Sequence, residues 1–201
     1  MTGCGLNRPI ESYVYVLLTA CMFGHMFIFQ SSIGPITDVL EEEFGLSSSE
    51  IGILSSANYF MALSFDIPWG LFLQIYTPEL GVLVAAFSMA VVCALFPFIG
   101  MTSHPLVAGC IIRGIGGAMT GQLWITGVTM AAHKFGNNSV GVITGLVGLI
   151  GSIHVTIGGI LQAMLYEKYQ VFWRELSLWF CVIHLFVWIP NGIGLILSLI
   201  C

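Results

Sequence analysis

Apolar residues run along this chain in long, nearly continuous stretches rather than in alternation with polar ones. A membrane-spanning helix needs roughly 20 predominantly apolar residues, and six stretches of that order are present. Their approximate limits are 13–35, 51–76, 80–101, 105–131, 140–165 and 176–200. Membrane-spanning β-strands would be short and would alternate in polarity. The pattern therefore predicts an all-α membrane protein in which residues 1–201 form a single bundle of six transmembrane helices.

The composition strengthens this prediction and removes several function classes. Hydrophobic residues make up 57% of the chain and charged residues only 7%, whereas soluble domains carry about 25% charged residues. The lipid bilayer is thus the expected partner, and a net charge of −5 argues against a nucleic-acid partner. The sequence has no CxxC pair, Cys/His cluster, P-loop or nucleophile–base pair. We therefore expect no metal and no cofactor, and an intramembrane enzyme is the least favoured function.

The two halves of the chain show a faint internal repeat. FGLSSSEIGIL, from Phe44, precedes the second stretch, and FGNNSVGVIT, from Phe135, precedes the fifth. With a short gap, Gly52 matches Gly141 and Gly70 matches Gly159. Because three spans reverse the direction of the chain, two such repeats would be inverted in the membrane, as in many secondary transporters.

Arg113 is the most unusual residue of the fourth stretch, because it lies roughly 12 Å of helical rise inside it. A charge within the membrane costs at least about 2.5–3.5 kcal/mol on insertion scales. Such a residue usually faces the bundle interior or a water-filled cavity and is paired. We expect a functional role or a structural ion pair for Arg113, with snorkelling to the surface as the simpler alternative.

Asp66 is a second intramembrane charge, within the segment FDIPWGLFLQ. It lies about 10 Å along the helix axis from the level of Arg113, so a direct pair is not expected. Asp66 is either a protonatable carboxyl that faces a cavity or a helix-end acid before a kink at Pro68. We expect Gly70 to admit a close neighbour.

Other polar and small residues within the stretches are weaker candidates. Interhelical hydrogen bonding is the simpler role for isolated polar residues, and a substrate path or coupling role is the alternative. These residues are Gln30, Asn58, Gln122 and His154. In the fifth stretch, small residues at helical spacing form one face, for which tight helix packing is favoured over substrate contact. They are Gly141, Gly145, Gly148, Ser152, Thr156 and Gly159.

The order of these motifs resembles the amino-terminal half of a major facilitator superfamily transporter. The segments that carry the resemblance are FGLSSSEIGIL, IPWGLFLQ, IIRGIGGAMTG, VGLIGSIHVTIGG and FWREL. The resemblance implies a cytoplasmic N-terminus and places the intramembrane arginine of the family on Arg113. It also implies that the first, second, fourth and fifth spans line the path. Gln74 departs from the family, which has an acid there before basic residues, so a charged inner gate is not supported.

Two functions remain open. In the first, the chain is a six-helix half of a transporter that moves a small solute by alternating access. Two bundles rock around a central site in this mechanism, so a second six-helix bundle, from another copy or a separate chain, would be needed. In the second, the chain is a non-transporting membrane interaction protein derived from a transporter half.

Overall fold

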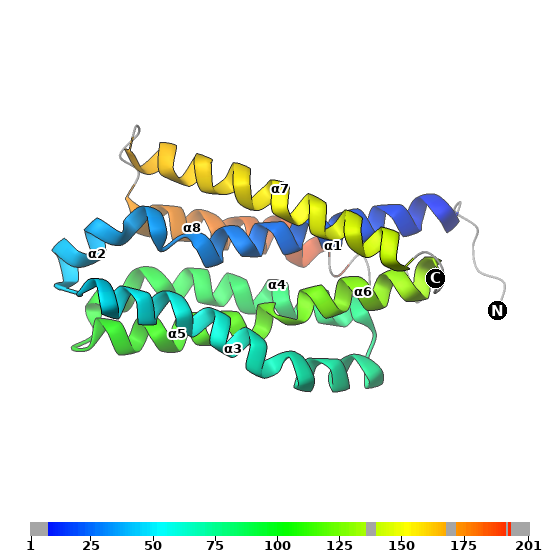
Figure 1. Cartoon of the computed structure of the whole chain (residues 1–201), viewed down its shortest axis with the longest axis horizontal. Helices are drawn as coiled ribbons and strands as arrows, with labels where there is room; N and C mark the ends of the chain where they lie inside the picture. The colour runs from blue at the N-terminus through cyan, green and yellow to red at the C-terminus, as the bar shows by residue number, and fades with distance from the viewer. Residues whose placement is uncertain (1–7, 136–139, 168–171, 192, 194–201) are drawn as a thin grey trace.

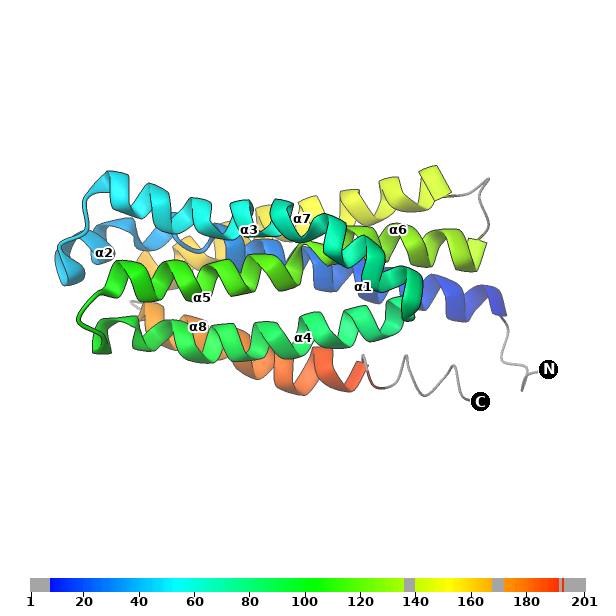
Figure 2. The ribbon, with the colours of Figure 1, turned by 90° about the horizontal axis from the view of Figure 1, so that it is seen from below.

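The computed structural model describes residues 8–135, 140–167, 172–191 and 193, and these form helices joined by short turns. The long helices lie side by side along the long axis of the molecule (Figures 1 and 2). The α-helices are α1 (Arg8–Ser31), α2 (Thr37–Phe44), α3 (Ser48–Ile75), α4 (Pro78–Leu95), α5 (Pro105–Thr120), α6 (Gln122–Phe135), α7 (Val140–Glu167) and α8 (Trp173–Ile183). The shorter elements are the 3-10 helices η1 (Gly34–Ile36) and η2 (Phe96–Met101) and the π-helix η3 (His184–Trp188).

Four helical segments among the described residues are long and apolar enough to cross a membrane. They are Ser12–Phe44, Pro78–Met101, Pro105–His133 and Val140–Glu167. α3 has sufficient length, at 28 residues, but polar side chains such as Asn58, Asp66 and Gln74 reduce its hydropathy. The end of the sixth predicted stretch lies outside the described residues.

Two of these apolar segments are interrupted. The first changes from α1 to a turn, then to η1 and α2, over residues 31–37. The segment Pro105–His133 is divided at Gly121 into α5 and α6. Backbone groups at such breaks lose their helical partners, and within a membrane they must find others in the protein.

One end of the bundle is closed by local turn chemistry and a charge pair. α2 ends at Gly45, whose φ of 64° favours glycine. Ser47 then caps α3 reciprocally with Glu50. At the same end, Arg174 of α8 forms an ion pair with Glu43 of α2. The acidic segment after α1 and the start of α8 therefore lie together.

A seam of glycines joins α3 and α5, which make one of the two most extensive helix contacts. A Cβ at Gly109 would lie 2.7 Å from Leu54, and one at Gly117 would collide with the backbone of Asn58. A Cβ at Gly121 would lie 2.9 Å from the Ala62 carbonyl. The two backbones thus approach closely, as small residues permit in membrane helices.

The other extensive contact joins α1 and α7 and uses different glycines from those predicted. Gly151 lies against Phe23 and Gly158 against Ile28, while His154 packs onto Gly24. The predicted face points elsewhere: Gly141, Gly145 and Gly159 have nothing within 4 Å of a would-be Cβ, Gly148 only approaches Trp124, and Ser152 is exposed. Among the described residues, the close packing of α7 on α1 thus uses the second of its two glycine rows, and the predicted face remains a prediction.

The second half of α3 differs from one expectation. Pro68 is exposed, and α3 continues through it to Ile75 while its later part changes direction (Figure 2). A Cβ at Gly70 would meet nothing within 4 Å, so the expected close neighbour of Gly70 is absent among the described residues. Gln74 is exposed near the end of the helix.

Matched alanine substitutions separate seam packing from helix propensity. Gly117→Ala and Gly145→Ala gain the same intrinsic preference, up to about 1 kcal/mol. Only the first forces a methyl group into the α3 backbone, and overpacking costs roughly 1–3 kcal/mol. We expect Gly117→Ala to lower the thermal unfolding midpoint in detergent and Gly145→Ala to leave it unchanged or raise it. Equal shifts would contradict the close α3–α5 approach.

Candidate functional site

Arg113 lies fully buried on α5 and binds the end of α1. Its Nη2 donates to the Gln30 carbonyl at 2.6 Å, and its Nη1 donates to the Phe29 carbonyl at 3.5 Å. The guanidinium carbon lies 5.2 Å from the centre of the Phe29 ring and 5.8 Å from that of Phe96. The Nε atom has no partner. Arg113 is therefore enclosed by carbonyl oxygens and aromatic rings.

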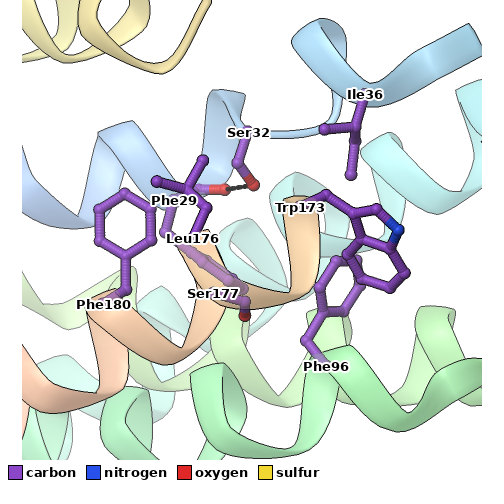
Figure 3. Close-up of a pocket in the computed structure, with 8 residues that line it drawn as sticks. All are labelled: Phe29, Ser32, Ile36, Phe96, Trp173, Leu176, Ser177 and Phe180. Atoms are coloured by element: carbon purple, nitrogen blue, oxygen red, sulfur yellow. Dashed lines mark hydrogen bonds between the residues drawn. The ribbon is translucent and has the colours of Figure 1, made fainter. Parts of the chain in front are cut away.

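These carbonyls belong to the last turn of α1, where helical partners are missing. Other side chains also serve this turn. Gln162 of α7 donates from Nε2 to the Ile28 carbonyl at 3.3 Å, and the Ser32 hydroxyl donates to the Phe29 carbonyl at 2.6 Å. Figure 3 shows the Ser32 bond close to the break, with Trp173 and Phe96 nearby. Side chains from α5 and α7 thus complete the hydrogen bonding of α1.

The surroundings of Arg113 explain how its charge is accommodated. The carboxyl end of a helix carries roughly half a negative charge, and the guanidinium fork can bind two carbonyls together. No described carboxylate lies within ion-pair distance of Arg113. Sequence analysis predicted either a functional role or a structural ion pair for Arg113. The structure shows Arg113 in a structural contact, but it binds the carboxyl end of a helix and not an acidic side chain. Snorkelling is not observed, because the side chain is 0% exposed.

Asn58 supports this arrangement from α3. Its Nδ2 donates to the Arg113 carbonyl at 3.1 Å, and its side chain is fully buried. Trp69, also on α3, donates from its indole nitrogen to the Ala118 carbonyl. Both bonds fix α3 to the backbone of α5, so Asn58 lies beneath the surface of the bundle and not on an open wall.

An open cavity of about 470 Å³ lies between α1, α3 and the α5–α6 break, and we call it the α1–α3 cavity. Its polar lining comes from Gln30, Tyr59, Asp66 and Thr120, and its apolar lining includes Trp124. Gln30 Nε2 donates to the Thr120 hydroxyl at 3.3 Å, and Gln30 Oε1 has no partner. The wall therefore presents a carboxyl group and hydroxyl groups, whereas Gln30 Oε1 is itself buried.

Two predicted candidates lie outside this cavity. Gln122 is buried at the start of α6 and donates from Nε2 to the carbonyls of Gly81 and Met119, at 3.0 and 3.1 Å. It thus connects α6 to α4 and gives a carbonyl group at the break after α5 a hydrogen-bond donor. His154 is half-buried on the α1–α7 seam, where Nδ1 lies 3.3 Å from the Ile150 carbonyl.

The structure therefore divides the six path candidates. Gln30 and Asp66 share the cavity wall, Arg113 and Asn58 lie behind it, and the remaining two stabilise helix seams. Tyr59, Thr120 and Trp124 are among the lining residues that sequence reasoning missed. Thr120 and Trp124 lie on either side of Gly121. A glycine in the middle of a predicted span could therefore have indicated a helix break and the lining residues beside it.

The chemistry of the site is that of hydrogen bonding and charge. Within the described part of the chain, no group of three or more His, Cys, Asp or Glu residues could hold a metal ion. The cavity offers a carboxyl, hydroxyls and aromatic surface.

Comparison with known proteins gives two matches. Residues 18–199 match the Major Facilitator Superfamily. The nitrate/nitrite transporter NrtP of Picosynechococcus sp. is 26% identical over 136 residues, which cover 68% of this chain and 24% of that transporter. The matched part thus spans about a quarter of the length of this relative.

Replacing Arg113 tests its role at the end of α1. Arg113→Met removes the guanidinium from both carbonyls, but the Phe29 carbonyl keeps the Ser32 hydroxyl and N–H as donors. The Gln30 carbonyl loses its described donor, and an unsatisfied buried group costs roughly 1–3 kcal/mol. We expect a clear loss of thermal stability in detergent. The matched control is Glu43→Gln, which removes the partly exposed ion pair with Arg174, worth about 0–1 kcal/mol, and keeps the Arg174 bond to the Pro97 carbonyl. Equal losses in the two variants would contradict the proposed difference.

Proposed function

Because the chain belongs to the Major Facilitator Superfamily and is an integral multi-pass membrane protein, we propose that it forms one half of a secondary transporter for a small solute. The half comprises six transmembrane helices in two inverted three-helix repeats. The first repeat is α1, α3 and α4, and the second is α5–α6, α7 and α8–η3. A second bundle, from another copy or a separate chain, completes the path.

The observation that carries this proposal is the α1–α3 cavity. It opens at the side of the bundle, where Tyr59, Leu63 and Trp124 are each more than 40% exposed. Asp66 contributes a carboxyl group to its wall, and Tyr59 and Thr120 contribute hydroxyl groups. Polar groups in lipid are costly unless they face a cavity or a protein partner. A second bundle opposite this wall would enclose a solute between the two.

The helix pairing supports the two repeats. An inverted repeat equates the first span with the fourth and the second with the fifth. The α1–α7 pair joins the first and fifth spans, and the α3–α5 pair joins the second and fourth. If each span is replaced by its equivalent in the other repeat, the first–fifth pair becomes the fourth–second pair. These two pairs make the most extensive helix–helix contacts of the bundle.

The cavity also indicates the class of solute. The relative is named a nitrate/nitrite transporter, but Arg113, the buried cation near this site, already binds two carbonyls and is not exposed. Asp66 is the charged residue of the wall. A small cation or a neutral hydrogen-bond donor therefore matches this half of the site better than an anion does, and Asp66 would bind the solute or a coupling proton.

Gln74 and the glycine face of α7 bear on gating and assembly. Gln74 offers an exposed amide where the family has an acid, so closure at this end would depend on neutral contacts. The face containing Gly141, Gly145 and Gly159 has no neighbour within the described chain, and a second bundle would cover it. The same face also fits the alternative function, a membrane interaction protein without transport.

Uptake into proteoliposomes tests transport directly. We expect the reconstituted chain to take up a small cation in preference to nitrate, with methylammonium, whose N–H groups can donate to a carboxylate, as the probe. Asp66→Asn should reduce this uptake at least about tenfold, since hydrogen bonds to charged groups contribute about 1.5–3 kcal/mol. Asp38→Asn, on exposed α2, is the control and should have no effect. Cation uptake that is insensitive to Asp66→Asn would contradict the assignment.

Cross-linking tests the second bundle independently. In a cysteine-free background, we expect Gly145→Cys to give disulfide-linked dimers in membranes if a second copy covers the glycine face. Ile143→Cys is the control because that side chain is 6% exposed inside the bundle. Dimers from Ile143→Cys alone, or from both variants equally, would show that the α7 face is not the contact.

A further inference from the structure

The α1–α3 cavity contains a continuous aromatic surface in addition to its carboxyl group. α1 contributes Phe23 and Phe27 to the lining, and α6 contributes Trp124. The centre of the Phe23 ring lies 4.7 Å from that of Phe27 and 5.5 Å from that of Trp124. These spacings are typical of aromatic rings in contact. The three rings therefore form one patch that joins α1 to α6, and we call it the aromatic patch.

The rings of the aromatic patch are supported by glycines of α7. A Cβ at Gly151 would lie 2.7 Å from the Phe23 ring, and one at Gly148 would lie 3.6 Å from the Trp124 ring. Both aromatic side chains nevertheless remain partly exposed, with Trp124 at 41%. A ring that packs on a helix with one side and lines a cavity with the other needs little further ordering when a molecule binds.

The carboxyl group of Asp66 lies close to this patch. Its Oδ1 would be 3.1 Å from a Cβ at Gly121. Gly121 keeps the right-handed helical conformation, with φ −52° and ψ −37°, so Trp124 follows about one turn later. Since Cβ atoms three residues apart in a helix are about 5–6 Å apart, Asp66 Oδ1 lies within about 9 Å of the Trp124 Cβ. One small molecule can therefore contact both side chains.

Asp66 has no positive partner within the described part of the chain. Its side chain is half-buried, and no described residue forms a hydrogen bond or an ion pair with it. The residues described as lining the cavity include neither lysine nor arginine. A carboxylate that is partly removed from water is costly unless it is paired. A cation that enters the cavity would supply the missing partner.

The lining favours an organic cation over an inorganic one. A metal cation such as Ca²⁺ or Mg²⁺ takes six or more oxygen ligands, whereas Asp66, Tyr59 and Thr120 supply the oxygen atoms on the wall and most of the lining is apolar. An ammonium group needs fewer oxygen partners, and an apolar body attached to it gains free energy when it leaves water. Aromatic faces also attract cations, and tryptophan does so most strongly.

We propose that the solute of the α1–α3 cavity is an arylalkylammonium ion, a primary ammonium group joined to an aromatic ring by a short chain. Asp66 accepts a hydrogen bond from the ammonium group, and the aromatic patch binds the ring. This inference rests on the proposed function, because it takes the α1–α3 cavity as the solute site. It adds that the solute has an aromatic body beside its charge.

Equilibrium binding to the full chain in phosphatidylcholine nanodiscs tests the solute class, with empty nanodiscs as the background. We expect 2-phenylethylammonium to bind at least about tenfold more tightly than methylammonium, which lacks the ring, and than 2-phenylethanol, which lacks the charge. Equal affinity for either control compound, or no binding of 2-phenylethylammonium, would overturn the proposal.

The binding assay also separates this inference from the transport proposal, because binding needs no turnover. The expected binding without uptake of any solute would contradict transport and leave the assignment of the site intact. Uptake of methylammonium that depends on Asp66, without tighter binding of 2-phenylethylammonium, would contradict the aromatic body alone.

Matched tryptophan variants locate the binding. Trp124→Leu keeps an apolar side chain but removes the indole, and it should lower the ratio of the affinities for 2-phenylethylammonium and methylammonium at least about threefold. Trp179→Leu, on an exposed part of α8 outside this cavity, should keep the ratio. Because the ratio compares two ligands on the same variant, a loss of folded protein alone would not change it. A ratio that Trp124→Leu leaves unchanged, or that both variants lower equally, would overturn the proposal.

Discussion

A helix that ends inside a membrane bundle leaves carbonyl groups with no water to bind, and α1 ends in this way. The carbonyls of Ile28, Phe29 and Gln30 each receive a hydrogen bond from a side chain of another span. Arg113 supplies two of these bonds and Gln162 the third. The buried charge and the broken helix therefore stabilise each other, since the cation lies at the negative end of the helix dipole.

This arrangement requires the helices around α1 to lie close. A guanidinium reaches the backbone of α1 only if α5 is held nearby, and α3 holds it through the Asn58 bond and the Gly117 contact. On the other side, Gly151 and Gly158 allow α7 to approach α1, which brings Gln162 within bonding distance. The glycine contacts thus allow Arg113 and Gln162 to reach the carbonyls of α1. The Gln162 bond in turn determines which glycine row of α7 faces α1.

The sequence was informative about helices and less so about their partners. Hydropathy located the four apolar segments that are long enough to cross a membrane among the described residues. The depth of Arg113 marked it as a buried charge. Its partners could not be predicted, because every residue has a carbonyl and no residue type marks an unpaired one. The α7 glycines show the same limit: two rows have helical spacing, and only the position of α1 selects between them. Gly70 likewise has the right residue type but no helix beside it.

The same end of α1 also borders the α1–α3 cavity. Gln30 places its carbonyl against Arg113, and its side chain lines the cavity. Two residues earlier, the Ile28 carbonyl accepts the bond from Gln162 of α7. Because side chains of α5 and α7 bind these carbonyls, α1 cannot shift at this part of the cavity wall without breaking those bonds. The interactions that complete the end of α1 therefore also fix the wall on which Gln30 lies.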